Sequence, residues 1–188
     1  LFVEKPLCID PVDLTEIVKS YEASRELEQP PILMVGFNRR FAPQVRRIQS
    51  LIGASQEPKA MVMTVNAGMI PADHWIQDPE IGGGRIIGEC CHFIDLLRHL
   101  ADSSITSVSA EAAGSSDGEA PRDTVSIQLA FENGSIGTIH YFSNGNKAYS
   151  KERLDVFCSG KVLVLDNFRR LTGYGFRGFS RMNLWKLD

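Results

Sequence analysis

Residues 123–142, DTVSIQLAFENGSIGTIHYF, alternate between apolar and polar residues on both sides of Asn133-Gly134. Alternation with a period of two is typical of strands that bury one face, and Asn-Gly is a strong turn signal between two such strands. This stretch therefore predicts a β-hairpin. Residues 105–113 and 153–166 alternate in the same way, so the second half of the chain predicts a mainly antiparallel sheet.

The first forty residues show a different pattern. Residues 1–3 predict a short strand, and residues 10–27 predict a helix with Asp10 as its N-cap and Pro11 in its first position. The continuous apolar run ILMVGF (32–37) is typical of a strand buried on both faces. Strand, helix and strand in this order form one parallel crossover unit. The chain is therefore expected to combine an α/β part with a following α+β part.

Further elements are expected between and after these patterns. A second amphipathic helix begins near Ala42-Pro43, residues 59–68 predict a strand, and residues 69–81 predict a loop. A largely apolar helix follows that loop. A polar, Gly/Ser-rich loop is expected at 114–122.

Composition excludes several classes of function. The net charge of −3 leaves no basic surface for nucleic acid, and no apolar run approaches the 18 residues that a membrane span needs. Cys8, Cys90, Cys91 and Cys158 lack metal-ligand spacing, so we expect no metal site and reduced thiols in a cytoplasmic protein. The chain lacks an initiator Met and ends abruptly, which we interpret as a fragment of a longer protein.

Residues 82–97, GGGRIIGECCHFIDLL, start the apolar helix and also carry ionisable groups. The face opposite the apolar stripe holds Arg85, Glu89, His92 and His99. This polar strip is either the solvated side of a surface helix or the wall of a cleft. Gly88 favours the cleft, because a glycine inside a helix costs up to about 1 kcal/mol relative to alanine and suits a position of close approach.

Two neighbouring features admit both a structural and a functional interpretation. The glycines at 82–84 lack the spacing of a dinucleotide fingerprint, so they predict a tight turn or clearance for a ligand. Glu4-Lys5-Pro6 follows a predicted parallel strand, and ligands gather at the carboxyl ends of such strands. An exposed turn is the alternative there. We expect the bond before Pro6 to be cis.

The segments VEKPLCI (3–9), VGFNRRFAP (35–43) and GGGRIIGECCHFIDLL, in this order, resemble the Gfo/Idh/MocA family of nicotinamide-dependent oxidoreductases. Residues 66–100 resemble a bacterial subgroup found with sugar-polymer biosynthesis. The resemblance implies that residues 1–40 are the C-terminal remnant of a dinucleotide-binding Rossmann domain without its glycine fingerprint. It also implies that residues 41–188 form an α+β substrate and oligomerisation domain, with an open sheet packed against helices.

The resemblance implies an activity, a cofactor and catalytic residues. Hydride would pass between NAD or NADP and a hydroxyl-bearing carbon of a sugar or nucleotide-sugar. Lys5 matches the family lysine between cofactor and substrate, and His92 matches the proton-transfer histidine. Gly88 stands where the family has an aspartate, so Glu89, on the same helix face as His92, is the candidate replacement.

The remaining candidate residues fall into two sets. The candidate cofactor-binding residues are Glu4, Lys5, Pro6 and Arg40. The candidate substrate-binding residues are Asn66, His74, Trp75, Arg85 and Asn144. For the loop residues and arginines among them, ordinary packing or surface charge is the alternative.

Three functions stay open at this point. The first is a sugar dehydrogenase of which this fragment alone is inactive. The second is an NAD-dependent glycosidase or epimerase of the same fold, and the third is a non-catalytic oligomerisation module. We expect a small-molecule partner, no nucleic-acid or membrane partner, and a homo-oligomer formed through the antiparallel sheet.

Overall fold

The computed structural model describes residues 1–53, 55, 57–71, 73–114 and 123–184. The chain divides into two compact units. The first unit consists of Leu1–Asn38 and Pro71–His92, and the second of Arg39–Ile70 and Phe93–Asp188. The chain passes between the units three times, and the first passage, between Asn38 and Arg39, lies close to the boundary expected at residue 40. No sequence pattern predicted that residues 71–92 join the first unit. The loop expected at 114–122 lies, apart from Gly114, outside the described residues.

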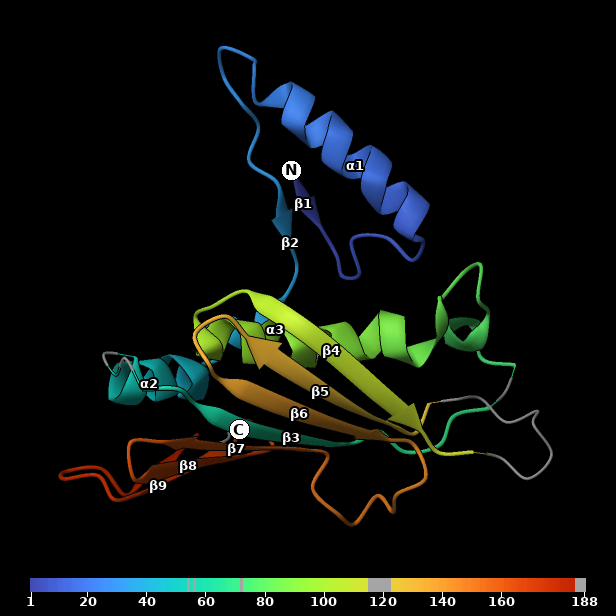
Figure 1. Ribbon diagram of the computed structural model, residues 1–188. Helices are drawn as coiled ribbons and strands as arrows, with labels where there is room; N and C mark the ends of the chain where they lie inside the picture. The colour runs from blue at the N-terminus through green and yellow to red at the C-terminus, as the bar shows by residue number, and fades with distance from the viewer. Residues whose placement is uncertain (54, 56, 72, 115–122, 185–188) are drawn as a thin grey trace. The chain divides into compact units, whose positions relative to one another are not determined.

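The first unit contains the predicted parallel crossover (Figure 1). Strand β1 (Phe2–Val3) pairs with β2 (Met34–Val35), and α1 (Pro11–Ser24) connects them. The Asp10 carboxylate accepts a hydrogen bond of 2.6 Å from the Val12 amide, which confirms the predicted N-cap. Both strands are shorter than the apolar runs that predicted them, because only Phe2–Val3 and Met34–Val35 pair with each other.

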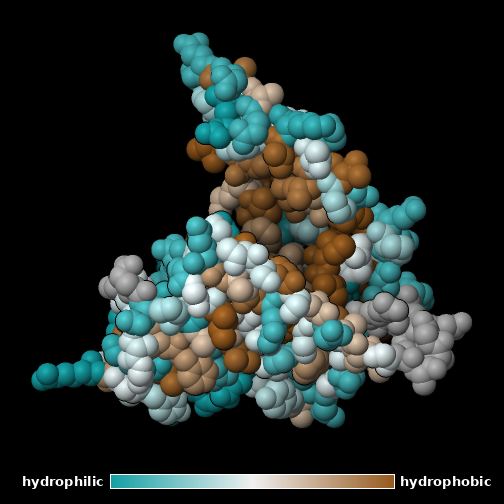
Figure 2. Space-filling view, viewed as in Figure 1, coloured by the Kyte–Doolittle hydropathy of each residue, from teal (hydrophilic) through white to brown (hydrophobic). Residues whose placement is uncertain are grey.

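Apolar side chains of the first unit remain exposed (Figure 2). Helix α1 has no buried residue, and Ile32 is 81% exposed. The expectation that residues 32–37 are buried on both faces is therefore wrong for the described chain, since β1 and β2 alone do not form a sheet wide enough to be covered. An apolar groove of about 520 Å³ runs between α1 and the strands; its lining includes Val3, Leu7, Ile17 and Tyr21.

The second unit is built on one eight-stranded sheet in the order β10-β9-β8-β7-β3-β6-β5-β4 (Figure 1). The strands are β3 (Ala60–Asn66), β4 (Ile105–Ala112), β5 (Val125–Phe131), β6 (Ile136–Phe142), β7 (Glu152–Cys158), β8 (Lys161–Asp166), β9 (Arg170–Tyr174) and β10 (Arg181–Asn183). Among the described strands of this sheet only the pair β3–β6 is parallel, so the predicted mainly antiparallel sheet is confirmed. Sequence analysis did not predict β9 and β10, whose segment is rich in glycine and lacks sustained alternation.

Helices α2 (Pro43–Ile52) and α3 (Cys91–Ala101) cover one face of this sheet (Figure 1). From α3, Phe93 meets Tyr141 with 6.5 Å between ring centroids, and Leu97 packs so closely on Gly137 that a Cβ there would lie 2.9 Å from its Cδ1. The alternate β3 residues Met61, Met63 and Val65 are buried beneath these helices. Among the described residues no helix is both long and apolar enough to cross a membrane.

Candidate active site

The Glu4-Lys5-Pro6 turn follows β1 directly, and the Lys5–Pro6 bond is cis, as expected from the sequence. The Lys5 ammonium donates a hydrogen bond of 2.6 Å to the carbonyl oxygen of Gly88. This bond joins residues 83 positions apart within the first unit. Lys5 is therefore held in one position, whereas an exposed turn lysine would be free to move.

The partner of Lys5 lies in a π-helical segment, Ile86–Cys90, which leads directly into α3. Sequence periodicity predicts a regular helix here and gives no sign of the wider turn. Single π-helical turns inside α-helices occur frequently at functional sites. The Gly88 carbonyl could not be predicted as the partner of Lys5, because a main-chain acceptor leaves no signal in a side-chain pattern.

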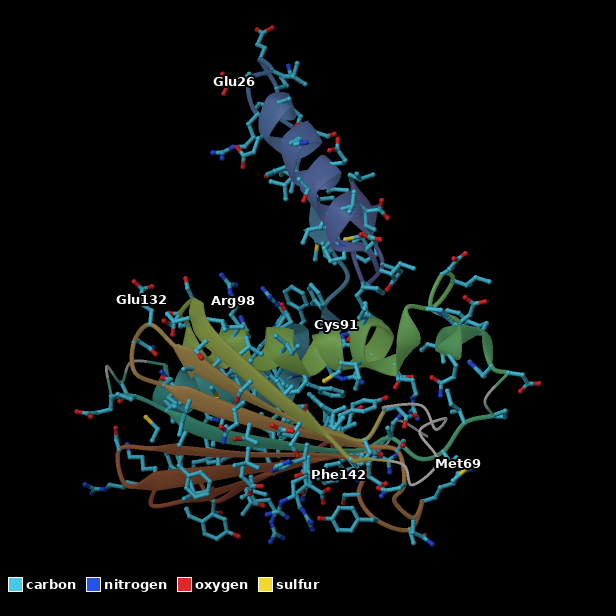
Figure 3. The ribbon with its side chains drawn as sticks, turned by 45° about the vertical axis from the view of Figure 1, so that its right-hand side comes forward. Glu26, Met69, Cys91, Arg98, Glu132 and Phe142 are labelled. Atoms are coloured by element: carbon cyan, nitrogen blue, oxygen red, sulfur yellow. The ribbon has the colours of Figure 1, made fainter. Side chains whose placement is uncertain are left out.

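His92 is buried, with 9% of its surface exposed, and its ring meets the edge of Phe37 with 6.2 Å between centroids. Phe37 directly follows β2, and Figure 3 labels Cys91, the residue before His92, at the start of α3. Arg85 is also buried. The polar strip of this helix is therefore not the solvated side of a surface helix.

Glu89 lies half-exposed on the same segment and accepts a hydrogen bond of 3.3 Å from the guanidinium of Arg85. The two residues are four positions apart, a spacing that brings side chains together on a helix. Arg85 thus fixes the carboxylate that lies three positions before His92. Burial, together with the neighbouring Cys91 and Glu89, raises the pKa of the Cys90 thiol to about 12.

The three glycines before this segment form a tight turn. A Cβ at Gly82 would lie 2.6 Å from the Ile76 carbonyl oxygen, and Gly83 and Gly84 both have positive φ angles, of 67° and 78°. The amides of Gly82 and Gly83 both donate to the carbonyl of Asp78. Because the Asp78 carbonyl occupies both amides, these two groups are not available to a ligand.

The loop before the glycines presents the aromatic candidates. The His74 imidazole accepts a hydrogen bond at Nδ1 from the Ile76 amide, which fixes its ring. Trp75 is 61% exposed and lies 5.8 Å from the His74 ring between centroids. Lys5, His74, Trp75, Arg85, Glu89 and His92 all belong to the first unit.

The two arginines after β2 belong to the second unit and make ion pairs there. Arg39 donates to Glu152 at 2.8 Å and lies over the rings of Phe93 and Phe168. Arg40 binds both carboxylate oxygens of Asp95 through its Nε and one Nη. Cation–π contacts and bidentate pairs of this kind fix both guanidinium groups within the second unit.

Asn66 and Asn144 also belong to the second unit. The Asn66 side-chain amide donates to the carbonyl of Asn146 at 2.7 Å, so it anchors the loop that contains Asn144. Asn144 itself is exposed. In the described part of the chain, no group of three or more His, Cys, Asp and Glu residues has the arrangement of a metal site.

The carboxyl ends of β1 and β2 fit the position at which a dinucleotide binds in a parallel sheet. Glu4 lies against Gly36 so closely that a Cβ there would come within 3.0 Å of its Oε2. Gly36 thereby leaves room for a carboxylate at the strand ends, beside the fixed ammonium of Lys5. The predicted cofactor-binding residues Glu4, Lys5 and Pro6 thus lie together in the turn after β1.

These features place a lysine turn and a buried histidine in one unit. Residues 47–164 match the model of the GFO/IDH/MocA C-terminal domain. The chain therefore belongs to the Gfo/Idh/MocA family, as the sequence resemblance predicted.

Similar proteins include several dehydrogenases. The chain is 25% identical to myo-inositol 2-dehydrogenase of Thermotoga maritima over 176 residues, which are 92% of this chain and 51% of that protein. In fold it resembles UDP-N-acetylglucosamine 3-dehydrogenase of Acidithiobacillus ferrooxidans (TM-score 0.73, 18% identity, 100% of this chain and 56% of that one). It also resembles levoglucosan dehydrogenase in complex with NADH (TM-score 0.73, 18% identity, 97% and 54%). The chain spans about half the length of the curated relatives it matches.

Proposed function

We propose that this chain is the substrate-binding part of a nicotinamide-dependent oxidoreductase that acts on a hydroxyl-bearing carbon of a sugar or nucleotide-sugar. The hydrogen bond from Lys5 to the Gly88 carbonyl carries this proposal, because it ties the lysine turn to the segment that leads into His92. The substrates named for the related proteins, an inositol, a nucleotide-sugar and an anhydrosugar, support the choice of a polyhydroxy substrate.

In this proposal Lys5 and His92 have different tasks. A bound nicotinamide supplies the hydride acceptor or donor. His92 takes the hydroxyl proton when the alcohol is oxidised and returns it in the reverse direction, a task suited to a side chain that titrates near neutral pH. The Lys5 ammonium, positioned in advance by Gly88, stabilises negative charge on the substrate oxygen.

The other candidate residues support these two. Glu89, held by Arg85, takes the part of the aspartate that this chain lacks at position 88 and orients the imidazole. His74, Trp75, Arg85, Asn66 and Asn144 are the proposed substrate contacts, and the exposed Trp75 ring suits the apolar face of a sugar. Arg40 is the proposed cofactor contact of the second unit, through Nη1, the nitrogen that Asp95 leaves unused.

We further propose that residues 1–40 are the C-terminal part of a dinucleotide-binding domain. The parallel pairing of β1 with β2 supports this, as does the apolar groove beside α1, because parallel sheets are normally covered on both faces. On this basis the 188 residues alone are expected to bind no NAD or NADP stably and to turn over no sugar. Detectable dehydrogenase activity of the isolated chain would contradict this part of the proposal.

We also propose that the chain forms a homo-oligomer through the open face of the sheet, which is the face opposite α2 and α3. One row of cross-strand partners runs over that face: Tyr174, Val162, Phe157, Ala60, Ile136, Ala130 and Ser107. The row is bulky at the β9 end, whereas at the β4 end small side chains form a shallow hollow of about 190 Å³. A two-fold axis would bring the bulky end of one copy onto the hollow of the other, which makes the surface self-complementary.

The test is a turnover assay on the polypeptide that contains these 188 residues. It is incubated with NAD or NADP and a panel of sugars and nucleotide-sugars, and both product and reduced cofactor are measured. A dehydrogenase forms one reduced cofactor per sugar oxidised. Sugar turnover without net reduced cofactor would instead support the glycosidase or epimerase alternative.

A further inference from the structure

A polar pocket of about 310 Å³ lies in the second unit, where α2 and α3 end. Figure 3 labels two residues at this end of the unit, Arg98 in the last turns of α3 and Glu132 in the turn between β5 and β6. Ile52, Leu100 and Ala101 are buried and give the pocket an apolar floor. Its polar lining consists of Gln49, Ser55, Lys59, His99, Asp102 and Asn133.

Lys59 is the most unusual residue of this lining. Only 5% of its surface is exposed, yet among the described residues its ammonium has no hydrogen-bond or ion-pair partner. Its main chain is tied to the β5–β6 hairpin, because its amide donates to Ser135 and its carbonyl accepts from Ile136. Its stem is buried, whereas its Nζ is not among the buried atoms that lack a partner, so the ammonium opens into the pocket, where a ligand can supply an acceptor.

Two further groups face the pocket without a protein partner in the described part of the chain. The Nε2 atom of His99 is shielded from solvent and makes no hydrogen bond, and the Asp102 carboxylate makes none either. Burial and the neighbouring Arg40 lower the pKa of His99, against the opposing effect of Asp95 and Asp102. Burial thus favours the neutral form of the His99 imidazole, while Lys59 and the exposed Asp102 bring one basic and one acidic side chain to the lining.

A lining of this kind selects the chemistry of its ligand. The two opposite charges favour no net charge on the ligand, while the ammonium, carboxylate, amides and imidazole require hydrogen-bonding groups that both donate and accept. Hydroxyl groups meet this requirement, and the apolar floor suits the C–H face of a ring. We propose that this pocket is a second binding site of the chain, for a small neutral polyhydroxy compound such as one sugar ring.

The test is a titration of the isotope-labelled 188-residue chain with methyl β-glucopyranoside, followed by amide chemical shifts in NMR spectra. Saturable shifts are expected at residues 53, 59, 102 and 133, with a Kd on the order of 1–10 mM for so small and polar a ligand. Inorganic phosphate serves as the charged probe. Saturable shifts at these amides with phosphate but not with the glucoside would overturn the neutral ligand class, and no saturable shift with either probe would overturn the site.

Two variants of the pocket lining and one control variant test whether the lining side chains bind the ligand. Lys59→Met retains the buried stem and removes the ammonium, so it should weaken glucoside binding at least tenfold without lowering the melting temperature. Asp102→Asn is a second test that keeps a residue tolerant of the positive φ of 53° at this position. Glu132→Gln removes a nearby carboxylate outside the lining and should leave the Kd unchanged. Equal Kd values for all three variants and the unmodified chain would contradict the proposal.

Discussion

Lys5 and Gly88 are joined by a hydrogen bond of 2.6 Å from the side-chain ammonium to the main-chain carbonyl. The bond links the end of β1 to the π-helical segment that precedes α3. Gly88 occupies the position at which the family resemblance implies an aspartate. The carbonyl therefore provides an acceptor for the lysine at a position where this chain has no carboxylate.

Gly82→Ala should destabilise the first unit, whereas Gly88→Ala should be tolerated. A Cβ at position 82 meets the main chain of Ile76, which cannot yield without moving the turn, and overpacking of this kind costs about 1–3 kcal/mol. At position 88 the nearest atom is 3.2 Å away, and alanine also favours the helix. Urea denaturation of both variants checks this. Equal losses of unfolding free energy in the two variants would contradict the turn geometry.

Arg40→Met should lower the free energy of unfolding of the second unit by about 3 kcal/mol, because it leaves a largely buried carboxylate without its partner. The double variant Arg40→Met/Asp95→Asn removes that charge and should recover at least half of the loss. Chemical denaturation of these two variants and of Asp95→Asn measures the coupling. Additive losses would show that Arg40 and Asp95 do not interact.

The Cys90 thiol gives the first unit a defined pH dependence. Its pKa is raised from 9.0 to about 12 in the folded chain, so the folded state holds the thiol proton more tightly than the unfolded state does. This contribution to stability is complete below about pH 9 and is lost as the pH rises through about 12. The difference in unfolding free energy between the unmodified chain and Cys90→Ala should therefore shrink over that range, as measured by denaturation. A difference independent of pH would refute the buried neutral thiol.

Ile136→Glu should convert the proposed homo-oligomer into a monomer. Ile136 is 57% exposed at the middle of the apolar row on the open sheet face, and a carboxylate there would be buried between two copies without a partner. Light scattering after gel filtration gives the mass. Val108→Glu, which adds the same charge to an exposed position of β4, is the matched control and should not change the mass. A monomeric unmodified chain would contradict the interface.

Much of the second unit could be predicted from the sequence because its strands alternate strictly. The hairpin at Asn133-Gly134 and the buried positions Met61, Met63 and Val65 follow from the period of two. The parallel pairing of β3 with β6 could not be predicted, because it joins residues about 76 positions apart and depends on the whole sheet. The β9–β10 hairpin lacks alternation and was missed for that reason.

The candidate side chains of the site were proposed from the sequence, whereas its main-chain geometry could not be. Lys5 and His92 were identified by resemblance, and the N-cap at Asp10 follows from local chemistry. The π-helical turn and the Gly88 carbonyl were missed, because neither changes the residue pattern of a helix. The Arg40–Asp95 pair was likewise missed, since side chains 55 positions apart meet only in the folded unit.

The most direct test of the proposed function compares His92→Asn and Lys5→Met with His140→Asn in the polypeptide that contains this sequence. His140 hydrogen-bonds to Ser126 on the sheet and has no part in the proposed chemistry. We predict that kcat/KM for the sugar falls about 10²–10⁴-fold in the first two variants, with loss of one ionisation from the pH profile in His92→Asn, and stays unchanged in His140→Asn. An unchanged kcat/KM and pH profile in His92→Asn would contradict it.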